Sequence, residues 1–579
     1  MENKGILAVC PGHNSSVTLI VNDRVEFYLE EERLTKIKYD HDPYKTISYV
    51  LSEFKNVEIT DFCVVGTSEN MNDYIHLFNF FSKLIRKDDV GFWYWGIDHH
   101  KMHAACAFYN SGFDSALAFI IDGAGSYKRL TNNNAGWQTE SVLICKKPNT
   151  FEYLNENLGC NYLNNEQDNY FQDNPLSVES QHISLYDDCG IVKAYEGITD
   201  FLGFHFIDAG KTMGLSSYGK PNEKFKDLFI DKRGNRKYFR PMYPAGSKVI
   251  SKHLIEYKAD KSWHKNPNLV NSVMKDVSYE LQQQSQSALL NLILEKIKIY
   301  STKNIVLAGG YGLNCVSNYF LRKNLPKDYN LYVEPISHDG GTSMGAAKLI
   351  WHLKNEDLKN NNFKQNSIYY GPSYSLDDIE KALINCSDKF DVKENIIYSD
   401  IVDLLLKENM ICMFQGRSEA GPRALGNRSI LFDPRVKDGK DKVNLVKKRE
   451  WFRPFAGSVL LEKASQWFDM AGLEESPYMM YAVDVLENKA ENIPSITHVD
   501  NTCRVQTVTK TQNLHFYNLI EEFDKQTGIP ILFNTSFNLA GEPLVETIED
   551  ALSTLERSDL EYLYLPEYNK LVCKKIIDS

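Results

Sequence analysis

Two histidines and two aspartates have a spacing that could hold a metal ion. His99 and His103 stand four residues apart in DHHKMHAACAF, so on a helix both side chains project from the same face. Asp122 ends the apolar run ALAFII, and Asp339 lies in the turn HDGG before a helical pattern. Two imidazoles and two carboxylates without a thiolate suit Fe(II), Mn(II) or Zn(II). The alternative is that the histidines begin a helix and the aspartates cap turns, but carboxylates in two Gly-rich turns favour a metal.

Three turns rich in glycine and small polar residues follow predicted strands. They read PGHNSS after the apolar run ILAVC, DGAGS after ALAFII, and GGYGLN after NIVLA. Glycine lets a backbone approach a ligand closely, and free backbone N–H groups attract phosphate. Each turn alone is more often only a turn, but three on one chain favour a nucleotide cleft. PGHNSS also holds His13, although a hairpin loop needs no titratable side chain.

A basic cluster interrupts an otherwise acidic chain. The whole sequence carries a net charge of −12, yet the stretch 416–454 holds eleven Lys and Arg against five Asp and Glu. Its arginines lie in GPRALGNRS and WFRPFAG, among residues apolar enough to bury part of their stems. Because guanidinium groups grip phosphate through paired N–H groups, this stretch favours anion binding over a solvated surface.

The elements that must position these residues form a repeated α/β pattern. A strand, a polar turn and a strand occur at residues 5–34 and again around 116–146, with helices after each. We therefore expect two similar α/β halves within one architecture. A long helix is predicted over 273–300, and the polar run 355–367 is the expected linker to a different α/β pattern.

Length and composition limit the classes of protein that fit. A chain of 579 residues exceeds what one core supports, so two or more domains are expected. Nothing in it approaches an apolar run of about 20 residues, and the first 30 residues show no secretory signal. Eleven cysteines without a CxxC pair indicate reduced thiols in a cytoplasmic protein. The acidic balance argues against a nucleic-acid polymer as partner.

Motifs along nearly the whole chain resemble those of the O-carbamoyltransferases of nodulation-factor and antibiotic biosynthesis. They occur in order as PGHNSS, EEERLTKIK, DHHKMHAACAF, IIDGAGS, GLSSYGKP, LAGGYGLN, HDGGTSMGAA, GRSEAGPRALGNRSIL, KKREWFRPFAGS, CRVQTV and FNTSFNLAGEP. The resemblance implies an α/β protein with an N-terminal actin-like (ASKHA) duplicated domain over 1–360. It also implies a C-terminal α/β domain over 368–579 that is similar to threonylcarbamoyl-adenylate synthase.

The resemblance also implies four groups of site residues. The metal, expected to be iron, would contact nucleotide phosphates and be held by His99, His103, Asp122 and Asp339. The adenosine pocket would contain Lys211, Gly214, Gly309, Gly310 and Asn314. Carbamoyl phosphate and ATP would be bound in the second domain by Arg423, Arg428, Lys447, Arg453, Arg504 and Ser536. His13 would deprotonate an acceptor hydroxyl, a task that suits imidazole, although a turn histidine bonded to its own backbone is an equal alternative.

The implied reaction is ATP-dependent O-carbamoyl transfer with Mg(II)-bound ATP. Carbamoyl phosphate would be cleaved to carbamate, which attacks the α-phosphorus of ATP and releases pyrophosphate. The carbamoyl-adenylate would then pass to the first domain and carbamoylate an alcohol. Acceptors of the family include sugars, natural products and hydroxymethylated pyrimidine nucleotides, and the sequence leaves a homodimer open.

Three other functions are weighed against this one. A tRNA-modifying threonylcarbamoyl enzyme is disfavoured because the chain lacks a basic stripe interleaved with aromatic residues. A non-enzymatic actin-like ATP-binding module has no need for the basic cluster or for His13. A metallopeptidase would need a glutamate directly after the first histidine, as in HExxH, and that position holds His100.

Overall fold

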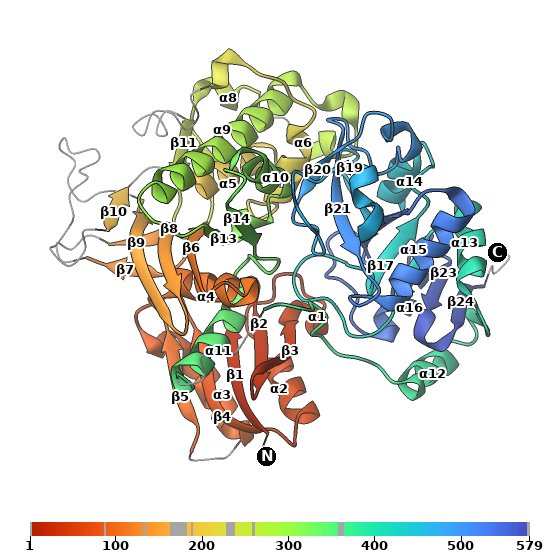
Figure 1. Ribbon diagram of the computed structural model, residues 1–579, viewed down its shortest axis with the longest axis horizontal. Coiled ribbons are helices and arrows are strands. Elements are labelled where there is room, and N and C mark those ends of the chain that lie inside the picture. Colours follow the sequence, from red (N-terminus) through yellow and green to blue (C-terminus); the bar gives the residue numbers. More distant parts are fainter. Residues whose placement is uncertain are drawn as a thin grey trace. The chain divides into compact units, whose positions relative to one another are not determined.

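The computed structural model describes residues 3–85, 89–130, 135–161, 182–186, 189–226, 228, 238–257, 261–356 and 364–575 (Figure 1). The chain divides into two compact units. Met1–Glu31 with Tyr39–Gln365 form the N-terminal unit, and Glu32–Lys38 with Asn366–Ser579 form the C-terminal unit. The expected linker, 355–367, lies partly outside the described residues, because 357–363 are not among them.

Two sheets with the same topology form the frame of the N-terminal unit. The first has the strand order β3-β2-β1-β4-β5 and the second the order β10-β9-β8-β6-β13-β14. In both, the strand that opens the repeat (β1 or β6) pairs antiparallel with the next main strand and parallel with a later one. The first sheet comprises β1 (Lys4–Cys10), β2 (Ser16–Val21), β3 (Arg24–Glu30), β4 (Glu58–Val65) and β5 (Gly91–Trp95). The second comprises β6 (Ser115–Ile121), β8 (Ala135–Lys146), β9 (Thr150–Gly159), β10 (Ile183–Tyr186), β13 (Asn304–Ala308) and β14 (Asn330–Val333), with β7 (Tyr127–Arg129) paired to β8.

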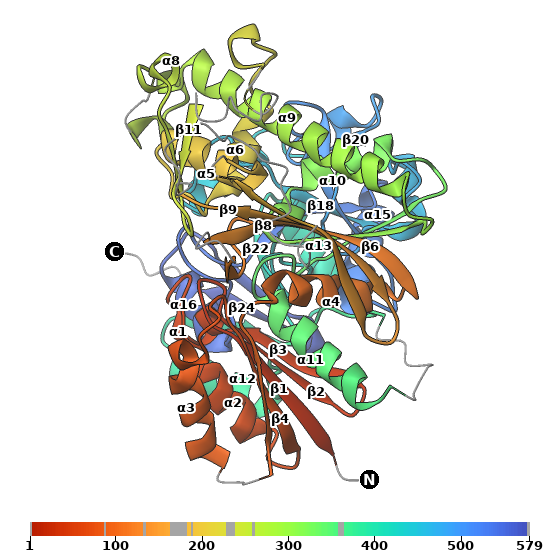
Figure 2. The same cartoon turned by 90° about the vertical axis from the view of Figure 1, so that its left-hand side faces the viewer.

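This repeat confirms the predicted duplicated α/β fold of the N-terminal part. Helices α4 (His99–Ser111) and α11 (Gly341–Lys354) lie between the two sheets (Figure 2). Helix α11 packs on β1, β2 and β4, α4 packs on β6, β8 and β13, and the two helices pack on each other. A Cβ atom on Gly345 of α11 would lie 2.0 Å from the carbonyl oxygen of Met102, so this contact requires glycine. The first turn of α4 and the start of α11 are thereby held side by side.

A buried polar network fastens the two helices further along. The Lys348 ammonium on α11 donates to the side-chain oxygen of Asn110 on α4, and the Asn110 amide donates to Glu334 Oε2 at 2.9 Å. Lys348 is 1% exposed and Glu334 is fully buried. Burial lowers the pKa of Lys348 to about 8, opposed by the charges of Cys106 and Glu334.

This network predicts a pH-dependent difference in stability between the wild type and Lys348→Met. Between about pH 8 and 10.5 the folded protein has released the Lys348 proton while the unfolded chain still holds it. The contribution of Lys348 to the free energy of unfolding therefore rises with pH, by up to about 1.4 kcal/mol per unit. Denaturant unfolding from pH 7 to 10 measures it, and parallel curves for the two proteins would contradict the assignment.

Several other helices of the N-terminal unit pack on one another. Helix α9 spans Ser272–Ile297, close to the predicted 273–300, and packs against α5, α6 and α10. The described helices of this part are α2 (Tyr44–Glu53), α3 (Ile75–Ile85), α5 (Ile191–Phe201), α6 (Ala209–Ser216), α8 (Lys252–Ile255), α9 and α10 (Cys315–Asn324), with a small ribbon of β11 (Phe239–Pro241) and β12 (Ser247–Val249).

The C-terminal unit is built on one mixed sheet, as expected for an α/β domain. Its strand order is β15-β24-β23-β16-β17-β22-β18-β21-β20-β19 (Figure 1). The strands are β15 (Phe390–Lys393), β16 (Ile411–Phe414), β17 (Arg428–Phe432), β18 (Ala456–Leu460), β19 (Phe468–Asp469), β20 (Ala482–Val485), β21 (Thr502–Val508), β22 (Ile531–Ser536), β23 (Tyr562–Leu565) and β24 (Lys570–Lys574). The helices are α12 (Leu376–Asn385), α13 (Tyr398–Leu406), α14 (Gly439–Val446), α15 (Leu514–Thr527) and α16 (Ile548–Glu556), with most of α1 (Glu31–Thr35).

The cysteines and the lengths of the helices bear on two general expectations. All eleven cysteines lie in described segments and none is in a disulfide. Within the ranges given above, no helix has both the length and the apolar character needed to cross a bilayer.

Candidate functional sites

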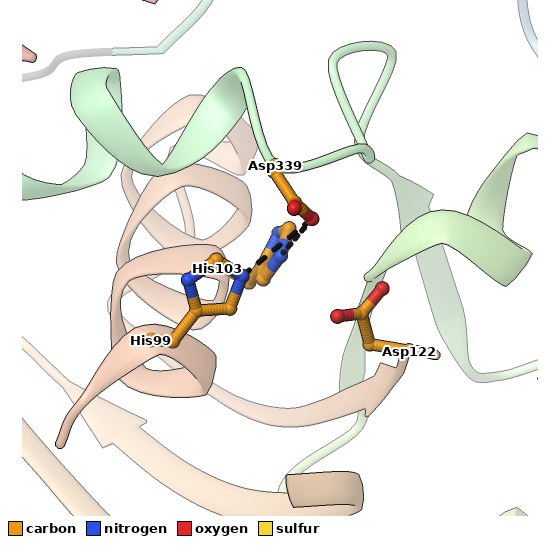
Figure 3. A group of neighbouring side chains, drawn as sticks. All are labelled: His99, His103, Asp122 and Asp339. Carbon is orange, nitrogen blue, oxygen red and sulfur yellow. Dashed lines mark ion pairs between the residues drawn. The ribbon is translucent and has the colours of Figure 1, made fainter. Parts of the chain in front are cut away.

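The four residues with metal-ligand spacing meet in the N-terminal unit. His99 and His103 lie in the first turns of α4, Asp122 directly follows β6, and Asp339 lies in the turn before α11 (Figure 3). One ligand atom from each of the four side chains lies within 4.8 Å of the others. The Nε2 atoms of His99 and His103 are 3.5 and 3.6 Å from Oδ1 of Asp339. Because α4 packs on β6, β8 and β13 and also on α11, it brings together His99 and Asp339, which are 240 positions apart in the sequence.

Burial and charge act in opposite directions on the two imidazoles. Burial lowers the pKa of both, whereas the Asp339 and Asp122 carboxylates raise it. The net pKa of His99 lies above its ordinary value, while that of His103, which is also repelled by His99, lies below. Burial raises the pKa of Asp339, but His13, His103 and His99 together hold it well below its ordinary value.

The chemistry of these donors fits a divalent metal ion. His99 and His103 are each 1% exposed, and among the described residues no ring nitrogen of either has a hydrogen-bond partner. Buried imidazoles normally have such partners, since leaving them unpaired costs about 1–3 kcal/mol. Two imidazoles and two carboxylates would satisfy Fe(II), Mn(II) or Zn(II). The neighbouring His100 differs, because its Nδ1 lies 2.8 Å from the Ser141 hydroxyl.

Loss of one donor is expected to abolish tight metal binding. Asp339→Asn removes the carboxylate charge while keeping the size of the side chain, so the affinity for Co(II) should fall at least about 100-fold. Metal titration followed by Co(II) absorption measures the loss. His76→Ala is the matched control, because His76 is exposed and lies 3.5 Å from Asp42, outside this cluster. Equal affinity of Asp339→Asn and wild type would show that Asp339 is no ligand.

The structure places His13 beside this cluster. The turn between β1 and β2 brings Nδ1 of His13 to 3.7 Å from Oδ2 of Asp339, with the histidine side chain 39% exposed. Gly12, with φ +115°, lets the turn double back so that its N–H donates to the carbonyl of His41 at 2.8 Å. An imidazole with one side toward the buried carboxylate and part of its surface open can reach a ligand.

The predicted adenosine residues fall into two groups. Gly309 and Gly310 follow β13, and the Gly310 N–H donates to Oδ1 of Asp122 at 3.0 Å. Gly309 has φ +85°, and a Cβ on it would lie 2.4 Å from the Ile121 carbonyl oxygen, so only glycine fits between these strand ends. This turn therefore lies directly beside the metal cluster.

The other three predicted adenosine residues lie on helices or at a helix end. Asn314 caps α10, and its amide donates to Gln282 Oε1 at 3.0 Å and to the Tyr195 hydroxyl at 3.3 Å. Lys211 on α6 pairs with Asp208 at 3.0 Å, and Gly214 is buried in the same helix. Helices α6 and α10 both pack on α9. Contact of these residues with adenosine stays a prediction.

The basic cluster of the C-terminal unit gathers around the end of β22. The Lys447 ammonium donates to the Ser536 carbonyl, and it also lies 3.2 Å from the Ser536 hydroxyl and 2.9 Å from Oδ1 of Asn538. Burial, and then the charges of Arg449 and Arg453, lower the pKa of Lys447 well below its ordinary value. The predicted pair Lys447 and Ser536 is thus in direct contact.

Two arginines lie close enough to Arg449 to repel its charge. Burial, and then Arg453 and Arg504, lower the pKa of Arg449. Arg504 on β21 is in register with Ala456 of β18, three residues after Arg453. Arg453 has one carboxylate nearby, that of Glu450 at 3.7 Å. An anion placed among these cations would relieve their repulsion, which is the property of a phosphate site.

Arg428 differs from the other predicted arginines. Its side chain is fully buried, and all three guanidinium nitrogens donate to carbonyl groups, of Glu546, Gln415, Asn427 and Gly416. The ring of Phe414 lies 3.8 Å from its guanidinium carbon. In this conformation Arg428 fastens its own loop, because four of its five N–H groups donate to carbonyl oxygens and Nη2 also lies 3.8 Å from Oε1 of Glu546. Arg423, five residues earlier, is half-buried on the same loop.

Several residues that shape these sites were not predicted. Arg449 stacks on Phe455 at 4.2 Å, and Asn538 accepts from Lys447. Both stand inside motifs that the sequence shows, KKREWFRP and FNTSFN, so the motifs were the available signal. Glu419 is 1% exposed, and its Oε1 accepts from the N–H groups of Leu425, Asn427 and Arg428 at 2.8, 2.8 and 3.1 Å. It too stands inside a quoted motif, GRSEAGPRALGNRSIL, but its residue type alone does not reveal that it is buried.

Two protein families match consecutive parts of the chain. The carbamoyltransferase N-terminus matches residues 82–348, which include all four residues of the metal cluster. The carbamoyltransferase C-terminus matches residues 402–572, which include the basic cluster.

Individual proteins show the same relationship. Nodulation protein NolNO of Sinorhizobium fredii is 30% identical over 593 aligned positions, covering 96% of this chain and 78% of that protein. Nodulation protein NolO of Bradyrhizobium diazoefficiens is 32% identical, covering 81% of this chain and 77% of that protein. Among solved structures, full-length HypF in its phosphate- and nucleotide-bound form aligns with 61% of this chain and 47% of its own, at 14% identity and a TM-score of 0.30.

Proposed function

The chain belongs to the carbamoyltransferase family, and from this premise we propose that it is an ATP-dependent O-carbamoyltransferase acting on a small-molecule alcohol. The carbamoyl group would come from carbamoyl phosphate by way of carbamoyl-adenylate. The observation that carries the proposal is the position of His13, 3.7 Å from Asp339, because it sets an imidazole beside a donor cluster suited to a metal.

Activation is assigned to the C-terminal unit. Water hydrolyses carbamoyl phosphate to carbamate and phosphate, and a carbamate oxygen then attacks the α-phosphorus of ATP and expels pyrophosphate. Arg423, Arg453 and Arg504 are assigned to the phosphate groups, with Lys447 and Ser536 at the end of β22. The charge of the arginines stabilises the negative charge that builds up on phosphate oxygens, a contribution of about 2.7–4 kcal/mol for each well-placed donor.

Transfer is assigned to the N-terminal unit. His13 takes the proton of the acceptor hydroxyl as its oxygen attacks the carbamoyl carbon, and AMP leaves. His99, His103, Asp122 and Asp339 would hold a divalent metal, which when bound supplies positive charge to nucleotide phosphates. Lys211, Gly214, Gly309, Gly310 and Asn314 are assigned to the adenosine. The acceptor is proposed as a sugar, a natural product or a hydroxymethylated pyrimidine nucleotide.

One assay tests the whole proposal. The protein is incubated with carbamoyl phosphate, Mg-ATP and a panel of alcohols of these three classes, and AMP, pyrophosphate and product masses are measured. We expect AMP and pyrophosphate in equal amounts, and a product in which one carbamoyl group replaces a hydroxyl hydrogen. ATP binding without any AMP would support a non-enzymatic module instead. If tRNA replaces the alcohols in a parallel incubation, a product formed only there would support the threonylcarbamoyl alternative.

A further inference from the structure

A buried arginine from the N-terminal part of the sequence belongs to the C-terminal unit. Arg33 lies in the motif EEERLTKIK, directly after β3, and its segment Glu32–Lys38 groups with residues 366–579. The side chain is only 3% exposed. The roles assigned above leave this motif without a function.

The guanidinium group of Arg33 has few partners for a buried cation. Its Nη2 donates to the carbonyl oxygen of Gly421 at 2.9 Å. Within the described residues, Nε and Nη1 have no hydrogen-bond partner. Burying such donors unpaired costs about 1–3 kcal/mol or more for a charged group, so a purely structural role explains them poorly. Three residues later, Lys36 forms an ion pair with Asp550, which holds the segment in place.

Gly421 begins the loop that carries Arg423. Its φ of +84° sets a sharp turn, and the Arg33 contact holds the carbonyl of that turn. The far end of the loop is held by Glu419, which accepts the three backbone N–H groups of Leu425, Asn427 and Arg428. Arg423 lies between these two attachment points, so the direction of its side chain depends on both.

A buried carboxylate links Arg33 electrostatically to the arginine that follows the loop. Glu546 is fully buried and lies 3.8 Å from Nη2 of Arg428. The charges of Arg428 and Arg33 both oppose the rise that burial imposes on the Glu546 pKa. Arg33 therefore acts electrostatically on the same buried carboxylate as Arg428, which follows the loop in the sequence.

We propose that Arg33 is a positioning residue of the anion site in the C-terminal unit, where it fixes the Gly421 turn so that Arg423 can bind a substrate phosphate. The inference rests on the proposed function, because the anion is taken to be a phosphate of carbamoyl phosphate or ATP. It makes the activation step depend on a segment whose sequence neighbours all lie in the N-terminal unit.

The test uses the full chain and measures pyrophosphate release from ATP and carbamoyl phosphate without acceptor. We expect Arg33→Gln to raise the KM for a phosphate substrate about 10- to 100-fold, the size of effect that follows a small misplacement of a binding group. Arg33→Lys should lie between Arg33→Gln and wild type, because one ammonium keeps the charge but lacks the planar fork. Arg24→Ala is the matched control, since Arg24 is an arginine nearby in sequence with its side chain 84% exposed.

Two further measurements separate a positioning role from a loss of folding. Methylguanidine added to Arg33→Ala should restore part of the activity, and Co(II) binding by the N-terminal unit should stay at the wild-type level in every variant. If Arg33→Gln does not fold, Arg33→Lys decides, and an unchanged KM for both substrates in that variant overturns the inference. Absence of pyrophosphate release from the wild type would instead refute the proposed function itself.

Discussion

Replacing His13 by Asn is expected to abolish carbamoyl transfer while carbamoyl phosphate-dependent pyrophosphate release continues. An alcohol is not ionised at neutral pH, so its attack needs a base that removes the proton as the new bond forms. Asparagine keeps a polar side chain in the turn but cannot take that proton. The rate of product formation should fall by about 10²–10⁴, the usual contribution of general-base catalysis.

A matched variant keeps this result interpretable. His41→Asn makes the same replacement at an exposed histidine whose carbonyl accepts the N–H of Gly12, in the turn that holds His13. Its transfer rate should equal that of the wild type. His13 lies 3.7 Å from Asp339 but is not one of the four proposed metal ligands. The His13→Asn protein should therefore bind Co(II) as tightly as the wild type. Normal product formation by His13→Asn would remove the base from the mechanism.

The N-terminal fold and the meeting of the two histidines and two aspartates could be predicted because short sequence patterns determine them. The pattern of strand, turn and strand occurs twice and predicts one antiparallel pair of strands each time. A helix follows each pair, and a strand that comes after such a helix joins the sheet in parallel. His99 and His103 need only one helix face, and Asp122 and Asp339 occupy turns after strands. The duplicated sheets then bring those turns together, so a local pattern was enough for a long-range site.

The C-terminal site was less predictable because its residue types do not reveal their partners. Arg428 and Arg423 stand five residues apart in GPRALGNR, yet the guanidinium group of Arg428 donates hydrogen bonds to four carbonyl groups of its own unit. The difference between the two arginines depends on where the carbonyl oxygens of residues such as Gln415 and Glu546 lie in the folded unit. The spacing of residues in the sequence does not give these positions. The position of Arg33 was equally hidden, because a strand and a short helix give no sign that seven residues pack with a distant part of the chain.

Replacing Arg453 by Ala is expected to block activation itself, in contrast to His13→Asn. Arg453 belongs to the group of cations, with Lys447, Arg449 and Arg504, whose mutual repulsion an anion would relieve. Loss of one guanidinium that stabilises phosphate charge should lower the rate of pyrophosphate release about 10²- to 10³-fold. Transfer should fall equally, because no adenylate is formed.

The same basic stretch supplies the control for that experiment. Arg435 makes two-pronged contacts with Asp433, with Nη2 at 2.6 Å, and its charge is thereby compensated. Arg435→Ala changes the net charge of the protein by the same amount as Arg453→Ala, so it should leave pyrophosphate release near the wild-type rate. Equal losses in both variants would mean that overall charge, and no specific site, attracts the substrates. Normal release by Arg453→Ala would remove Arg453 from the activation site, and the same pair of measurements on Arg504→Ala would then show whether the remaining cations bind the phosphate.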